Sequence, residues 1–248
     1  MRPELWDRWT AHDPGATAQL NHVAWDYLLD TYLRRAGTVQ LFDYRAVTPQ
    51  DRLLLDDYVE SLAGVPISRY ARPEQLAFWI NLYNAVTLKV VLDNYPIDSI
   101  REVDSLFRLG GPWDEKRVTV AGEKLSLDDI ENRILRPIWR DARVHYALNC
   151  AAKGCPDLAA VAFTSENTEA LLDAGARAYI NDGRGVRLRD GDLFVSSIFK
   201  WYREDFGGSD AGILAHLKRY AEPGLRAKLA AVKSIKGYSY DWDLNDAR

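Results

Sequence analysis

The sequence lacks three features that would place the protein in a special class. No stretch of about 18 apolar residues occurs, so we expect no membrane-spanning helix. The 2 cysteines are too few for a fold built on disulfides. Acidic and basic residues nearly balance, at 36 and 32, and the net charge of −4 argues against a nucleic-acid partner.

The amino-terminal segment also lacks the apolar core of a signal peptide. Arg2, Glu4, Asp7 and Arg8 interrupt its apolar residues, so an intact leader is not expected. With so few cysteines, this pattern predicts a cytoplasmic protein. The alternative is a periplasmic or exported protein whose leader was removed before this numbering begins.

The composition is that of a globular chain, with 47% hydrophobic residues and 8 tryptophans but 1 methionine. Large, rigid aromatic side chains are therefore expected to anchor the core. No repeat or linker divides the chain. We predict a single α+β domain over residues 21–248, preceded by an extension over residues 1–20, with a helical amino-terminal part packed on a small, mostly antiparallel sheet.

Periodicity and turn signals place the elements along the chain. Helices are expected over residues 25–33, 48–64, 73–93, 126–135, 165–180 and 197–205. Strands are expected over residues 117–120, 123–125, 144–148, 186–189, 193–195 and 238–244. Apolar residues surround the 73–93 segment on all sides, which predicts a central, buried helix.

That helix carries a polar stripe on one face. Asn81 and Asn84 lie three residues apart, and Thr87 follows at the same spacing. Burying an amide without a partner costs roughly 1–3 kcal/mol. The stripe is either a paired structural network or the lining of a pocket in which Asn81 orients a catalytic group.

A second cluster, His145–Pro156, holds a histidine and both cysteines. On the expected strand His145 and Asn149 share a face, and Cys150 points away. A turn at Lys153-Gly154 would bring Cys155 back towards His145. Four interpretations stay open: a structural cluster, a Cys155 thiolate nucleophile, a Cys150/Cys155 redox pair or disulfide, and a weakly supported metal site.

No established cofactor or metal motif accompanies this cluster. The chain contains no P-loop, no G-x-G-x-x-G, no H-E-x-x-H and no G-x-S-x-G. We therefore expect neither a cofactor nor a bound metal.

Several segments resemble the bacterial and plant family known as domain of unknown function 547. Phe78–Ala85, with the sequence FWINLYNA, resembles its signature helix, and His145–Pro156 resembles its histidine–cysteine motif. Leu125–Glu131, Ser197–Phe206 and the Tyr240–Trp242 tail resemble further motifs. The resemblance implies a fold more firmly than an activity. Gly154 stands where serine is common in that family, and Asp157 where a second proline is common.

Three classes of function follow from these residues. The first is a thiol-dependent hydrolase or acyl or peptidyl transferase, with Cys155 as nucleophile, His145 as base, and Asn81 or Glu131 orienting the imidazole. The second is a peptide- or small-molecule-binding module without turnover. Its expected binding residues are Trp79, Asn84, Asn149 and Cys150. A thiol redox role for Cys150 and Cys155 is the third hypothesis.

Overall fold

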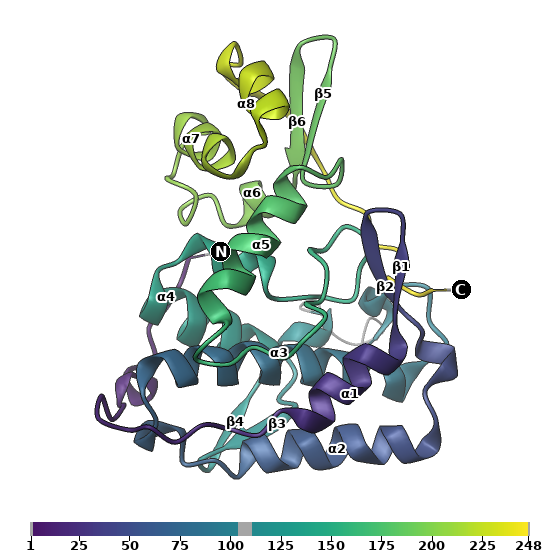
Figure 1. Ribbon diagram of the computed structural model, residues 1–248, viewed down its shortest axis with the longest axis vertical. Helices are drawn as coiled ribbons and strands as arrows, with labels where there is room; N and C mark the ends of the chain where they lie inside the picture. The colour runs from purple at the N-terminus through teal and green to yellow at the C-terminus, as the bar shows by residue number, and fades with distance from the viewer. Residues whose placement is uncertain (1, 104–110, 248) are drawn as a thin grey trace.

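The computed structural model describes residues 2–103 and 111–247, and the fold is α+β (Figure 1). Three helices build the amino-terminal half: α1 (Val23–Tyr32), α2 (Pro49–Ala63) and α3 (Arg72–Asn94). The later helices are α4 (Arg136–Trp139), α5 (Thr168–Ile180), α6 (Ile198–Trp201), α7 (Asp210–Tyr220) and α8 (Pro223–Ala230).

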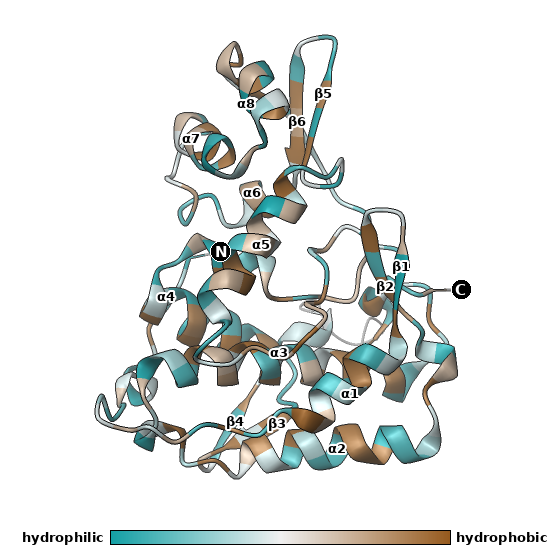
Figure 2. Cartoon of the chain, viewed as in Figure 1, coloured by the Kyte–Doolittle hydropathy of each residue, from teal (hydrophilic) through white to brown (hydrophobic). Residues whose placement is uncertain are grey.

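Helix α3 is the centre of the larger hydrophobic core, as the sequence predicts. All its residues from Glu74 to Leu88 are buried, so no face is left for solvent. Figure 2 shows it running between α1, α2 and the segments above it. The start of α2 also follows the prediction, because Thr48 caps it by accepting a hydrogen bond from the Asp51 N–H and Pro49 takes the first turn.

Within the described residues, the strands form three small sheets rather than one. Two are antiparallel hairpins, β1 (Leu33–Ala36) with β2 (Val39–Phe42) and β3 (Val118–Val120) with β4 (Glu123–Leu125). The third has the order β5–β6–β7, with antiparallel β5 (Val186–Arg189) and β6 (Asp192–Ser196) and a parallel β7 (Ile235–Ser239). The β1–β2 hairpin, which turns at Gly37, is not foreseen by the sequence analysis.

Three predicted elements are wrong in type or position. Residues 144–148 are not a strand, because a 3-10 helix spans Ala142–Tyr146 and Asp141 caps it by accepting from the Arg143 N–H. The predicted 126–135 helix contains a π-helix, Asp129–Leu135, that runs directly into α4. The last strand ends at Ser239, and the tail beyond it makes only isolated bridges, one between Ala152 and Leu244.

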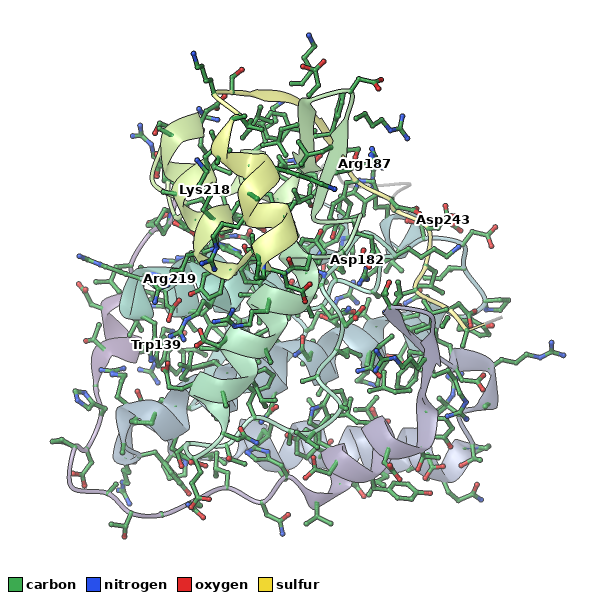
Figure 3. All side chains as sticks on the ribbon, turned by 45° about the horizontal axis from the view of Figure 1, so that its top comes forward. Trp139, Asp182, Arg187, Lys218, Arg219 and Asp243 are labelled. Carbon is green, nitrogen blue, oxygen red and sulfur yellow. A yellow bond between two sulfur atoms is a disulfide. The ribbon has the colours of Figure 1, made fainter. Side chains whose placement is uncertain are left out.

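A second, smaller hydrophobic core lies among α5, α6, α7, α8 and the β5–β6–β7 sheet, at the top of Figure 1. After β7 the tail returns to the larger core, where the Phe42 N–H donates to the Asn245 carbonyl. Figure 3 labels Asp243 on this tail and Lys218 and Arg219 on α7, towards the other side of the view. The return of the tail positions the candidate site, because it joins the two cores along one edge.

The segment before α1 packs against the larger core. Trp9 is 5% exposed, and its ring lies edge-on to Trp79 with the ring centres 5.1 Å apart. Among the helices within residues 2–103 and 111–247, none is long and apolar enough to span a membrane.

Candidate functional site

A cavity of about 540 Å³ opens where the two hydrophobic cores meet. Aromatic rings form much of its wall, namely Tyr83, Trp113, Trp201, Tyr202, Tyr240 and Trp242. Its polar lining includes Asp128, Glu131, His145 and Arg101, and Cys150 and Cys155 form part of one side. Four of the sequence-predicted site residues, Glu131, His145, Cys150 and Cys155, thus lie around one pocket.

His145 lies at the floor of this pocket between two carboxylates. Its Nε2 atom is 2.7 Å from Asp205 Oδ2, and its Nδ1 atom is 3.5 Å from Glu131 Oε1. Burial alone would lower the pKa of His145, but the hydrogen bonds to Asp205 and Glu131 outweigh it and raise that pKa above the ordinary value. The ring therefore favours the charged imidazolium form.

Asp205 holds this histidine from the turn after α6. Burial alone would raise the pKa of Asp205, but hydrogen bonds from His145 and Arg136 lower it to about 2. Arg136 Nε donates to Asp205 Oδ2 at 2.6 Å, and the Tyr202 ring stacks on His145 with ring centres 4.0 Å apart. These contacts fix the imidazole ring in one orientation.

The sequence alone does not connect Asp205 or Arg136 with His145. They lie 60 and 9 residues from His145, so no local spacing connects the three. Asp205 does fall in the Ser197–Phe206 segment, which resembles a family motif. An acidic residue in that segment was the signal by which the sequence could have indicated it.

Asp128 and Glu131 enter the same cavity from one helical turn. Burial raises the pKa of Asp128, against the lowering effect of the 2.6 Å hydrogen bond from Asn132 Nδ2, and the charge of Glu131 adds to the rise. The Tyr83 hydroxyl lies 3.5 Å from Glu131 Oε2. One carboxyl group of the pair therefore binds a proton more readily than an ordinary aspartate.

The two cysteines are joined in a disulfide, with Cα atoms 6.2 Å apart. The Tyr240 hydroxyl lies 3.1 Å from the Cys150 sulfur and 3.0 Å from the Cys155 sulfur. Among the described residues, His145 makes no hydrogen bond to either sulfur, because both its nitrogens face carboxylates. In this state Cys155 holds no thiolate, and the predicted Cys155–His145 pair is not formed.

The loop that carries the cysteines is pinned by neighbouring residues. Ala151 adopts a left-handed conformation, with φ 59°, and its N–H donates to Asn149 Oδ1 at 2.8 Å. The Gly154 N–H donates to the Asp241 carbonyl at 2.8 Å. A Cβ atom on Gly154 would lie 2.7 Å from Asp241 N, so a larger residue here would force the tail to shift.

Asp157, which stands where a second proline is common in the resembling family, also makes a contact that holds the loop. Asp157 accepts a hydrogen bond from Arg184 Nη1 at 2.8 Å, and the same guanidinium reaches the Cys155 carbonyl at 3.2 Å. An ion pair thus holds the far end of the cysteine loop.

The predicted asparagines lie outside the pocket lining. Asn81 donates to the Phe163 carbonyl at 2.7 Å and accepts from the Phe163 N–H at 3.0 Å. Asn84 donates to the Ala147 carbonyl and accepts from the Asn149 N–H, each at 2.9 Å. These bonds match the structural interpretation of the stripe, in which amides tie loops to the helix.

Two further predicted binding residues also contact other parts of the chain. The Asn149 side chain donates to the Pro156 carbonyl at 2.8 Å and so braces the cysteine loop. Trp79 is 1% exposed and lines a smaller, separate cavity of about 210 Å³ with Trp9 and Gln75. Among the described residues, no group of three or more His, Cys, Asp or Glu side chains could hold a metal ion.

The fold is therefore an α+β domain with an aromatic pocket built around a carboxylate–histidine–carboxylate cluster. Residues 67–180 match the family model described as "Protein of unknown function, DUF547", in agreement with the resemblance seen in the sequence. Neither the search of curated proteins nor the search of solved structures gave a match. Asp205 and Tyr240 lie beyond the matched segment, so the pocket needs both the family segment and the chain that follows it.

Proposed function

We propose that the protein is a glycoside hydrolase whose active site is the aromatic pocket, with Glu131 as general base and Asp128 as general acid. The observation that carries the proposal is the pair of carboxyl groups on one helical turn, of which Asp128 has the raised pKa. A carboxyl group whose surroundings raise its pKa, next to a second carboxyl group in one cleft, is typical of a general acid.

The walls of the pocket suit a sugar ring. Trp113, Trp201 and Trp242 line the pocket and offer apolar surface against which the C–H face of a sugar can pack, and the carboxyl groups of the same lining can accept hydrogen bonds from its hydroxyls. A cavity of about 540 Å³ lies within the usual range for small-molecule sites, roughly 300–1,000 Å³.

Each residue has a defined role in the proposed reaction. Asp128 gives its proton to the glycosidic oxygen as the bond to the sugar carbon breaks. Glu131 takes a proton from the water that attacks this carbon. The imidazolium of His145, held by Asp205, donates towards Glu131 and fixes its orientation. His145 is thus a positioning residue, in contrast to the base that the sequence analysis expects.

The test is hydrolysis of a panel of chromogenic glycosides. We expect Glu131→Gln and Asp128→Asn to lower kcat/KM by roughly 10²–10⁴-fold for the glycoside that is turned over. Glu60→Gln, which changes an exposed glutamate of α2, is the matched control. Wild-type turnover in Glu131→Gln would contradict the proposal. Quenching of tryptophan fluorescence by glycans without hydrolysis would favour the binding module.

A second candidate keeps the predicted thiol chemistry. Cys155 and His145 line the same pocket, so a thiol-dependent hydrolase or acyl or peptidyl transferase would require prior reduction of the disulfide. Turnover of an amide or thioester that needs reductant and is lost in Cys155→Ala would support it.

Disulfides persist in oxidising compartments, which favours the periplasmic or exported location over the cytoplasmic one.

A further inference from the structure

The disulfide forms one side of the pocket, and its two cysteines differ in exposure. Cys150 is partly exposed, whereas Cys155 is only 3% exposed. Both residues line the cavity, so a molecule in the pocket reaches the Cys150 sulfur more readily. In an exchange reaction this asymmetry makes Cys150 the sulfur that is attacked and Cys155 the sulfur that leaves.

The Cys155 sulfur is also surrounded by hydrogen-bond donors. The Cys150 main-chain N–H donates to it at 2.9 Å, and the Tyr240 hydroxyl lies 3.0 Å away. Burial raises the pKa of Tyr240 well above its ordinary value, so this hydroxyl keeps its proton and remains a donor. Hydrogen bonds to a thiolate stabilise its charged form, which makes Cys155 a good leaving group.

The geometry of the loop does not depend on the S–S bond alone. The Asn149 side chain accepts from the Ala151 N–H, and the Asn245 N–H donates to the Ala151 carbonyl at 3.0 Å. The Gly154 N–H is bonded to the tail at Asp241. These bonds keep both cysteines in place after the disulfide opens, so the bond can close again without refolding.

We propose that the Cys150–Cys155 disulfide is a reactive redox site that exchanges with low-molecular-weight thiols bound in the pocket. A thiolate attacks the Cys150 sulfur, the S–S bond breaks, and its electron pair stays on Cys155 as a thiolate. A second thiolate attacks the substrate sulfur of the mixed disulfide and releases Cys150. Two thiols are thereby oxidised to one small disulfide, and their protons end on the two reduced cysteines.

This activity does not rest on glycoside hydrolysis, because its reacting atoms are the two sulfurs and it can be followed without any sugar. It would share the pocket with the proposed hydrolase. Thiol exchange is assayed without a glycoside and glycoside hydrolysis without a thiol, so the two activities are measured independently. Failure of one proposal therefore leaves the other standing.

The test uses the folded full chain and reduced glutathione as the probe. Aliquots are alkylated at timed intervals, and the reduced fraction is read by mass spectrometry. We expect reduction without denaturant, and a rate about tenfold lower in Tyr240→Phe because one hydrogen bond to the leaving thiolate is lost. Tyr238→Phe, which removes a hydroxyl that contacts Arg203 instead, is the control and should react at the wild-type rate.

Single-cysteine variants test the assigned roles of the two sulfurs. With oxidised glutathione, Cys155→Ser should form a mixed disulfide at Cys150 quickly, and Cys150→Ser should react slowly at the buried Cys155. Reduction of the wild type only under unfolding conditions would overturn the proposal and mark the bond as structural. Equal trapping by the two variants, or a wild-type rate in Tyr240→Phe, would also overturn it.

Discussion

The polar face of α3 and the floor of the pocket are both buried, yet they pair their polar groups in different ways. On α3 the amides of Asn81 and Asn84 are bonded to main-chain atoms of the loops at Phe163 and Ala147–Asn149. At the pocket floor His145 is bonded to carboxylates, and one of these, Glu131, borders an open cavity.

The difference has a physical origin. An amide offers both a donor and an acceptor, so a peptide group can satisfy it completely and leave it inert. A carboxylate only accepts, and a neighbouring cation seldom occupies all its lone pairs. Buried polarity on a helix is therefore weak evidence for chemistry, whereas a charged group with one side open to a cavity is stronger evidence.

The largest effect that separates the two regions is expected for Asn84→Ala. The change removes two hydrogen bonds and leaves the Ala147 carbonyl and the Asn149 N–H buried without their partner. At about 1–3 kcal/mol for each of the two orphaned groups, the free energy of unfolding should fall by about 2–6 kcal/mol. Urea unfolding followed by circular dichroism measures the loss.

Asn94→Ala is the matched control for this prediction. Asn94 ends α3, is exposed, and donates one hydrogen bond to the Val90 carbonyl. Its loss should cost at most about 1 kcal/mol. Equal destabilisation by the two variants would show that the buried amide is not specially important, and the structural interpretation of the stripe would fail.

The sequence predicts well those parts of the fold that local signals determine. Helix α3 follows from its all-round apolar residues, and the start of α2 from its capping residues. The β5–β6 turn follows from Asp190-Gly191, which has the positive φ values of 51° and 86° that a tight hairpin needs. In each case the residues that specify the structure are neighbours in the chain.

Contacts between distant segments are what the sequence does not reveal. An apolar run at Val144–Leu148 favours a strand, but the cap at Asp141 and bonds from Asn84 hold it in a helical turn and a loop. Asp205 reaches His145 across 60 residues, and the tail reaches the cysteine loop from still further away. Glu131, His145, Cys150 and Cys155 could be predicted as site residues because they lie in short sequence motifs.

A second prediction concerns pH and the charged floor of the pocket. The pKa of Asp205 is lowered from 3.8 to about 2 in the folded protein, so its stabilising contribution is present above pH 4 and lost as the pH falls from about 4 to about 2. This shift corresponds to about 2 kcal/mol. Thermal unfolding of wild type and Asp205→Asn should differ at pH 6 and converge near pH 2.

The stabilising contribution of His145, in the same cluster, depends on pH in the opposite direction. Because the pKa of His145 is raised, its contribution is complete below about pH 6.5 and is lost as the pH rises through the folded-state value. Asp205→Asn should weaken that loss too, since it removes a partner of the imidazolium. A constant difference between the two proteins from pH 2 to pH 6 would refute the assigned ion pair.

The smallest effect is expected for Gly154→Ser, which tests the contact between the cysteine loop and the tail at the side of the pocket. In Gly154→Ser the new Cβ would lie 2.7 Å from Asp241 N and 2.8 Å from its carbonyl oxygen. The exposed tail can shift, so we expect a loss of only about 1 kcal/mol, at the low end for overpacking. The shift should move Tyr240 and Trp242 and therefore change the tryptophan emission spectrum.

Gly183→Ser is the control, because a Cβ at Gly183 meets no atom within 4 Å. This variant should keep both the stability and the emission spectrum of the wild type. If Gly154→Ser also keeps them, the tail accommodates the serine that is common in the resembling family. Tyr240 would then stay beside the sulfurs, and the glycine would not be needed to form this side of the pocket.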